Sequence, residues 1–248
     1  MENFSGSSHL FPNSGAIALC LRCDHLPIAA WTFGSGGNEM DAEGVQSEHD
    51  RLGYRLGWRF MTAPSANRLT SRVALVGLNP GGKENYEADN SERWSTEKGS
   101  SYVIEAWPGR PRGGDPLQVQ VQRMCKLIGA DPHQTFSAQF VPFRSDAWDQ
   151  LPRRPEALMF ASDLWAWALQ DAPAEIFLCL GKGVVAPGIA RLIGAQQVAP
   201  SPSGWGDISI DRYATRTGRL VLGLPHLGRF KLFGNRMRDE AFLAATKL

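Results

Sequence analysis

The sequence predicts an α/β protein, a three-layer α/β/α sandwich with a central sheet of four parallel strands. Four apolar runs are typical of buried strands, and they cover residues 72–78, 136–142, 175–180 and 219–224. Their near-continuous hydrophobicity is expected of strands that are covered on both faces. Helical patterns separate the runs, and such alternation favours right-handed crossovers between parallel strands.

The helical patterns cover residues 40–61, 116–129, 155–170, 182–194 and 233–247. Pro64 follows the first pattern and stops it, because the residue before a proline is biased away from helix. Pro116 and Pro155 stand in the first turns of the second and third patterns, where a missing N–H costs little. The segment 81–115 is rich in Gly, Pro, Trp and charge, and we expect a long connection that walls a ligand site.

Length and composition indicate one globular domain, since the chain has 248 residues of which 43% are hydrophobic. We expect an irregular N-terminal extension over residues 1–38 and a single domain over residues 39–248. No apolar stretch approaches the roughly 18 residues of a membrane span. The first residues lack the basic start and apolar core of a signal peptide. A soluble, cytoplasmic monomer without a membrane partner is therefore expected.

The four cysteines do not predict a metal site. Cys20 and Cys23 have CxxC spacing with His25 nearby, but a second close pair is missing from the sequence. Cys125 falls in a helical pattern and Cys179 in a strand pattern. Ordinary thiols are favoured, with a metal site or redox pair as the alternative.

Charge is unevenly distributed, although the net charge is only +1. Residues 1–50 hold seven acids and one base, whereas residues 212–238 hold seven bases and no acid. A local basic stretch is typical of polyanion binding, and a solvated basic surface is the alternative.

Two of the predicted strands end on a polar side chain. Asn79 follows the run 73–78 and His226 follows the run 220–224, and Gly or Pro breaks the chain at both places. In an open parallel sheet, ligands bind outside the carboxyl ends of the strands. An amide and an imidazole could therefore face one pocket.

The residues at these two ends resemble motifs of the uracil-DNA glycosylase superfamily. Gly77-Leu78-Asn79-Pro80-Gly81 is similar to the water-activating GxNPG motif of its mismatch-specific and single-strand-selective branches. Pro225-His226-Leu227-Gly228 resembles the second motif, usually His-Pro-Ser or Asn-Pro-Ser. Between them, Gln139–Ser145 stands where the family has a strand-end Asn, and Leu180-Gly181-Lys182 resembles a strand-end LGK. The four elements occur in the family's order over roughly residues 70–235.

The resemblance implies a division of chemical work. Asn79 would position a water below the sugar, and His226 would donate a hydrogen bond to the departing base. Asn cannot take up a proton as Asp does in the best-known branch, so weaker activity is expected. An Asn-Pro turn and a core histidine are the structural alternatives for these two residues.

The resemblance also implies substrate contacts. Gln139 offers the donor and acceptor of the family's Asn on a longer arm, unless Arg144 or Ser145 lines the pocket instead. Tyr86, Trp94 and Tyr102 are the candidates for stacking on the base. The expected substrate-binding residues are Gly77, Leu78, Pro80, Gly81, Tyr86, Gln139, Phe143 and Arg144.

DNA contacts are expected after the second motif, where family members press a loop into the duplex. Phe230 or Leu232 could act as an apolar wedge, with core packing of these residues and Phe233 as the alternative. Gly228 would let a phosphate approach the backbone. The expected DNA-binding residues are Lys182, Gly228, Arg229, Phe230, Lys231 and Leu232, and the start of helix 233–247 could add an anion site.

The chain departs from the family at two places. Leu227-Gly228 replaces Pro-Ser, which puts the usual serine–phosphate contact in doubt. The iron–sulfur branches carry four cysteines, but Cys125 and Cys179 are 54 residues apart, so neither a cluster nor any other cofactor is expected.

The predicted function is that of a monofunctional DNA glycosylase acting on uracil or a modified pyrimidine flipped out of DNA, leaving an abasic site. No lysine follows the strand-end motifs in an obvious Schiff-base position, although Lys83 is nearby. One alternative is a glycosylase acting on hypermodified phage bases in defence, and another is a non-catalytic nucleic-acid-binding module. A nucleotide-processing enzyme is less favoured, because 81–83 and 181–183 lack the full phosphate-loop spacing.

Overall fold

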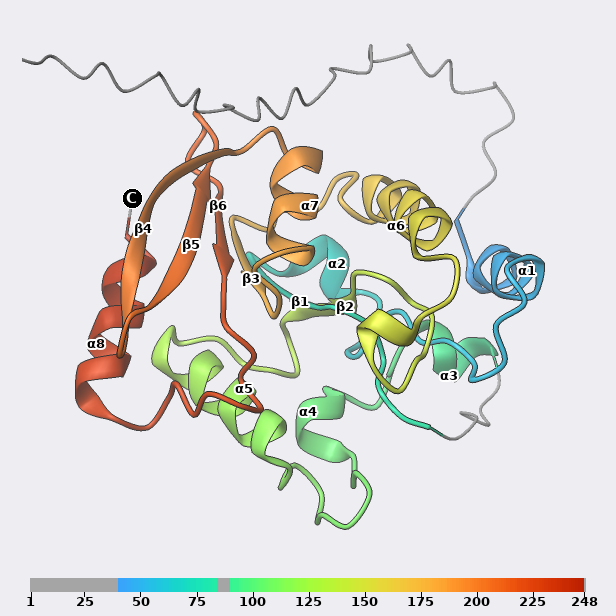
Figure 1. The fold of residues 1–248 in the computed structure, drawn as a ribbon, viewed down its shortest axis with the longest axis horizontal. Helices are drawn as coiled ribbons and strands as arrows, with labels where there is room; N and C mark the ends of the chain where they lie inside the picture. Colours follow the sequence, from blue (N-terminus) through green and yellow to red (C-terminus); the bar gives the residue numbers. More distant parts are fainter. Residues whose placement is uncertain (1–39, 84–89, 248) are drawn as a thin grey trace, which may run out of the picture. The chain divides into compact units, whose positions relative to one another are not determined.

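The computed structural model describes residues 40–83 and 90–247, and a six-stranded sheet lies at their centre. The strand order is β2-β1-β3-β6-β5-β4 (Figure 1). The four parallel strands are β1 (Val73–Gly77), β2 (Phe136–Gln139), β3 (Ile176–Cys179) and β6 (Leu220–Gly223). All four predicted apolar runs therefore form parallel strands, each shorter than its run.

The predicted number of strands is wrong, because a hairpin extends the sheet beyond β6. Strands β4 (Gln196–Trp205) and β5 (Ile208–Ala214) pair antiparallel, and β5 pairs antiparallel with β6. Most of β4 is exposed, so it lacks the apolar run of a buried strand. Its prolines Pro200 and Pro202 are compatible with an edge strand, where a ladder N–H can be missing.

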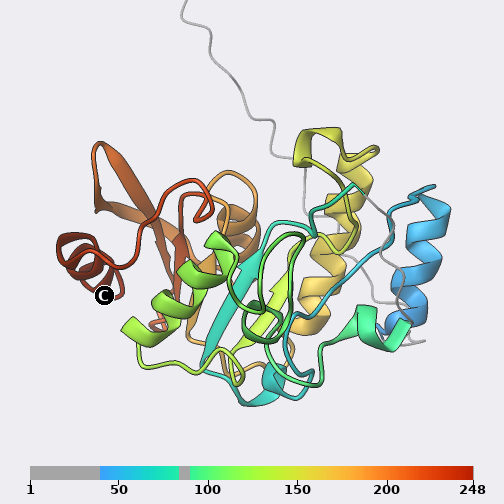
Figure 2. The same cartoon turned by 90° about the horizontal axis from the view of Figure 1, so that it is seen from below.

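Helices cover both faces of this sheet, as the α/β prediction requires. The two cores alternate along β1: Ala74 and Val76 belong to one core, and Leu75 belongs to the other. The first core lies under α6 (Arg154–Ala168) and α7 (Val185–Leu192). The second lies under α5 (Pro116–Leu127) and α8 (Arg236–Ala245). Figure 1 shows α6 and α7 on one side of the strands and α5 on the other. Figure 2 shows α5 lying across one face of the sheet.

The ends of the helices follow local chemistry. Helix α5 begins at the predicted Pro116, where Asp115 and Gln118 form a reciprocal capping box. The predicted helix over 40–61 is correct only for α1 (Ala42–Arg51). Gly53, directly after the C-cap residue Leu52, has a φ of 74°, a left-handed conformation that ends the helix. Gly57, in the segment that follows, has a φ of 78°. The chain then runs beside β2, with bridges from Trp58 to Phe143 and from Met61 to Ala138.

The long connection predicted over 81–115 contains two short helices in its described part. These are α3 (Asn90–Trp94) and α4 (Ser101–Ile104), while residues 84–89 lie outside the described chain. The remaining short elements are α2 (Asn67–Thr70) and the 3₁₀ turn Trp148–Gln150. The predicted extension 1–38 also lies outside the described residues. Among residues 40–83 and 90–247, no helix has the length and apolarity needed to cross a bilayer.

Candidate functional site at the carboxyl edge of the sheet

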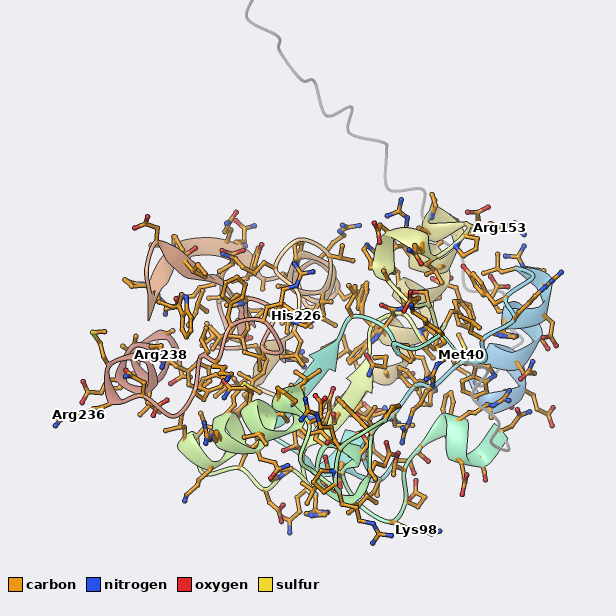
Figure 3. The ribbon with its side chains drawn as sticks, turned by 60° about the horizontal axis from the view of Figure 1, so that its bottom comes forward. Met40, Lys98, Arg153, His226, Arg236 and Arg238 are labelled. Carbon is orange, nitrogen blue, oxygen red and sulfur yellow. The ribbon has the colours of Figure 1, made fainter. Side chains whose placement is uncertain are left out.

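The register of the strands brings Asn79 and His226 to one level. Val76 pairs with Cys179, and Cys179 pairs with Gly223. Asn79 lies three residues beyond Val76, and His226 lies three residues beyond Gly223. Strands β1 and β6 are separated only by β3, so at about 4.8 Å per strand the two residues follow strand ends roughly 10 Å apart. Figure 3 places His226 on the loop after β6, at the arrowhead end of the strands.

Hydrogen bonds fix the orientation of the Asn79 amide. Its Nδ2 donates to Ser145 Oγ at 2.8 Å and to the carbonyl oxygens of Phe143 and Pro80, each at 3.3 Å. Carbonyl oxygens accept and cannot donate, so the nitrogen must face them and Oδ1 must face away. Within residues 40–83 and 90–247, no hydrogen bond reaches Oδ1. The partly buried Asn79 therefore presents a preoriented acceptor at the sheet edge.

The second motif presents His226 to solvent. The His226 carbonyl accepts from the N–H groups of Arg229 and Phe230, which closes a tight turn. Leu224 and Leu227, on either side, are buried and anchor this turn. The imidazole is exposed and folds over Gly228, where an added Cβ would lie 2.9 Å from His226 Cε1. Glycine at 228 thus leaves room for the ring.

Gln139 is almost fully buried against Gly77, two residues before Asn79. We refer to its side chain as the floor of the candidate site. It pairs with Gly77 across β1 and β2, and only 9% of it is exposed. Its side chain covers Gly77 so closely that a Cβ there would lie 2.2 Å from Gln139 Oε1. Burial raises the pKa of Tyr102 to about 12, opposed by the charge of Arg59 and a hydrogen bond with the Gln139 side chain. The side chains of Gln139 and Tyr102 are therefore close neighbours.

Of the three stacking candidates, Tyr102 is the one that meets the Gln139 side chain. It is itself buried and has a perpendicular contact with Trp107. Trp94 instead packs against Phe60 and Trp167, with ring centroids 5.3 Å away in both cases. Tyr86 lies outside the described residues.

Of the other residues predicted to contact substrate, some lie in the core and others lie in exposed loops. The side chain of Phe143 is fully buried between Tyr54 and Phe160, and its carbonyl oxygen accepts from Asn79 Nδ2. Arg144 packs its guanidinium over Gly82, where a Cβ would lie 2.2 Å away. Among the motif's other residues, Pro80 is buried, Leu78 packs partly against the core, and Gly81 is exposed and bridges to Ser145.

The loop after His226 is partly core and partly surface. Leu232 is fully buried with Phe233, so Leu232 is excluded as a wedge in this conformation. Phe230 is only half-buried and directs its ring edge toward Trp205, with centroids 6.3 Å apart. Gly228, Arg229 and Lys231 are exposed, which leaves them available for phosphates.

The side chain of Lys182, a predicted DNA contact, is engaged by the β4–β5 hairpin. Its Nζ donates to the Ser209 carbonyl at 2.8 Å and to Ser209 Oγ at 3.0 Å. It also forms an ion pair with Asp211 at 3.0 Å. The charge of Lys182 is thus neutralised against β5 and stabilises the junction of the hairpin with the sheet.

The basic stretch 212–238 does not form one surface. Arg219 donates to the carbonyls of Ala172 and Ala174, before β3, and stacks over Phe177. Arg216 lies in the connection between β5 and β6, at this same amino edge. Arg212 pairs instead with Leu222 within the sheet and donates to the Lys247 carbonyl. The bases that follow β6 are Arg229, Lys231, Arg236 and Arg238. Of these, Arg229 and Lys231 follow His226 on the same loop.

Sequence reasoning missed Trp205, which borders the site from the β4–β5 hairpin. Trp205 pairs with Ile208, and the two-residue link Gly206-Asp207 between them is a hairpin turn signal. That signal could have identified the hairpin. The guanidinium of Arg238 lies 4.4 Å from the centre of the Trp205 indole.

The larger of the two cavities described among these residues has a volume of about 640 Å³ and does not include Asn79 or His226. Carboxylates outnumber cations in its wall, so it would repel a polyanion such as DNA. The charged residues lining it are Asp41, Glu43, Arg59, Glu92, Glu97, Lys98 and Glu105.

The described cysteines are inert thiols. Burial raises the pKa of Cys125 to about 12 and raises that of Cys179 as well. No cluster of three or more His, Cys, Asp or Glu side chains suited to a metal occurs in the described part of the chain. Cys20 and Cys23 lie outside it.

A scan against protein-family models finds no match to this chain, and a search of curated proteins finds no significant relative. The similarity to uracil-DNA glycosylases therefore rests on the four motifs.

Proposed function

We propose that this protein is a monofunctional DNA glycosylase, which hydrolyses the N-glycosidic bond of uracil or a modified pyrimidine and leaves an abasic site. One observation carries the proposal: the preoriented Oδ1 of Asn79 and the exposed imidazole of His226 follow strand ends at one level of the sheet. The spacing of roughly 10 Å between these two strand ends suits groups that act on opposite ends of one nucleoside.

The reaction builds positive charge on the sugar and negative charge on the departing base. Asn79 Oδ1 accepts a hydrogen bond from the attacking water and holds it below the sugar. His226 donates a hydrogen bond to a carbonyl oxygen of the leaving base, which stabilises its charge. Asn79 is a positioning acceptor and not a proton acceptor, so the rate lacks the contribution of about 10²–10⁴-fold that general-base catalysis supplies.

A base must leave the helix to reach this edge, at a cost of a few kcal/mol. Phe230 is the remaining wedge candidate, because Leu232 is buried. The exposed cations Arg229 and Lys231 flank it and would hold phosphates on either side of the flipped nucleotide. In this proposal the DNA crosses the loop after β6.

Gln139 contributes selectivity from the floor of the site. Its side chain is buried and lies tightly against Gly77, so its freedom to reorient toward a base is small. A site built from fixed donors and acceptors discriminates against a base that leaves them unpaired.

The proposal is tested with oligonucleotides that carry uracil, hypoxanthine, a thymine mismatch or glucosylated hydroxymethylcytosine. Each is incubated with the full chain and then treated with alkali, which breaks the strand at abasic sites. Alkali-labile breaks are expected on one substrate, with at least a 10²-fold lower rate in His226→Ala, the usual effect of removing one charge-stabilising donor. Asn79→Ala should also abolish most of the activity.

Arg216→Ala is the matched control, because this exposed arginine lies at the opposite edge of the sheet. It should leave the rate unchanged. Absence of abasic sites on every substrate, or equal activity in His226→Ala and the wild type, would contradict the proposal. DNA binding without any cleavage would instead support a non-catalytic module.

A further inference from the structure

The β4–β5 hairpin continues the edge that carries Asn79 and His226. Asp211 of β5 pairs with Gly223 of β6, and Ile208 lies three residues further toward the tip. Trp205 pairs with Ile208 on the outermost strand. Trp205 therefore stands level with His226, two strand spacings or roughly 10 Å beyond it.

Four side chains make a surface that we term the Trp205 patch: Trp205, Phe230, Met237 and Arg238. Arg238 covers the Trp205 indole at 4.4 Å, and Phe230 meets it edge-on. Met237 is 66% exposed, which is unusual for a large apolar side chain. A hollow of about 290 Å³ opens between the hairpin tip and the start of α8, lined by Gly204, Trp205, Gly206, Asn235, Met237 and Arg238.

The charges around the Trp205 patch indicate which kind of ligand it would bind. Within residues 40–83 and 90–247, neither Arg229, Lys231 nor Arg238 forms an ion pair with a carboxylate. Arg236 is nearby but is paired with Glu240. The opposing charges close along the chain are Asp207 at the hairpin tip and Asp239, whose carboxylate accepts from the Gly234 N–H. Figure 3 shows Arg236 and Arg238 at the start of α8. Aromatic and thioether surfaces beside cations fit a ligand with planar rings and phosphates.

We propose that the Trp205 patch binds an unpaired nucleotide of single-stranded DNA, whose base enters the hollow while Arg229 and Lys231 hold its phosphates. We also infer that the same strand passes His226, and this part of the inference rests on the proposed glycosylase function. Binding to the patch itself does not depend on catalysis.

Single-stranded DNA is favoured over duplex because only unpaired bases expose their faces for stacking on aromatic side chains. One strand of a stacked helix advances about 3.4 Å per nucleotide, so the distance of roughly 10 Å corresponds to about three nucleotides. The patch would hold the strand a few nucleotides from the one at His226.

The test measures fluorescence anisotropy of a labelled, undamaged thymidine oligonucleotide with the full chain. Trp205→Ala should weaken binding about 5- to 150-fold, the effect of removing one base-stacking aromatic ring. Trp205→Phe keeps a ring and should bind within a few-fold of the wild type. Arg216→Ala at the opposite edge is the control and should bind as the wild type.

Met237→Asp provides a second variant that cannot fail through misfolding, since the side chain is exposed. A carboxylate in the hollow repels phosphates and should also weaken binding at least 5-fold. Unchanged binding in Trp205→Ala or Met237→Asp, or a wild type that does not bind the oligonucleotide, would overturn the inference. The assay uses no cleavable base, and it is repeated in Asn79→Ala, so its result is independent of the abasic-site experiment.

Discussion

The contact between Gly77 and Gln139 predicts a strong energetic coupling at the floor of the candidate site. A Cβ added at Gly77 would lie 2.2 Å from Gln139 Oε1 and 2.9 Å from its Cδ. The amide must therefore shift to make room for the methyl group. Overpacking of this kind costs about 1–3 kcal/mol.

A double-mutant cycle isolates this contact. Gln139→Ala removes the obstructing amide, so Gly77→Ala in that background should change the free energy of unfolding by less than about 0.5 kcal/mol. The coupling energy between the two positions is then about 1–3 kcal/mol, within the range for residues in contact. Urea unfolding measures it as a shift in midpoint at constant slope.

Gly183→Ala is the matched glycine control, because nothing lies within 4 Å of an added Cβ there and its φ is not positive. It should change stability by less than about 0.5 kcal/mol, as is usual for surface positions. If Gly77→Ala destabilised the protein equally with and without Gln139, the close approach would not be the cause and the proposed floor would be refuted.

Three further predictions follow from individual residues. The pKa of Tyr102 is raised from 10 to about 12, so its buried neutral hydroxyl stabilises the fold below pH 10. About 3 kcal/mol of the free energy of unfolding is lost as the pH rises from 10 to 12, because the tyrosine ionises first in the unfolded state. Unfolding of Tyr102→Phe measured over this pH range should show a smaller loss than unfolding of the wild type. Arg229→Ala should reduce the slope of log affinity against log salt by about 0.7 for single-stranded DNA, whereas Lys182→Ala should leave it unchanged and lower stability; equal slopes in both variants would contradict the assignment. Leu232→Ala should cost about 2–5 kcal/mol in urea unfolding, and Phe230→Ala should cost less while weakening DNA binding.

Local patterns in the sequence were enough to determine the parallel part of the fold. The four apolar runs became β1, β2, β3 and β6, because strands buried on both faces need continuous hydrophobicity. The start of α5 was also predictable, since a proline after a capping aspartate is a local signal. The Gly and Pro residues at the ends of β1 and β6 are also local signals, so they identified Asn79 and His226 as residues that follow strand ends.

The tertiary structure decided everything that depends on distant partners. Strand β4 is exposed and irregular, so only its pairing with β5 identifies it. Lys182 looks like a surface cation in the sequence, but Asp211 and Ser209 engage it from the hairpin. Leu232 looks like a loop residue, but it is buried in the core beside Phe233.

Asn79 and His226 show both contributions at once. The sequence by itself determined that an amide and an imidazole follow two buried strands, because Gly and Pro break the chain locally at those points. Only the strand order and register decided that both lie at one level, about two strand spacings apart. Only Ser145 Oγ and the Phe143 carbonyl, both distant in the sequence, decided which atom of Asn79 faces outward, because hydrogen bonds across the fold are not encoded in local pattern.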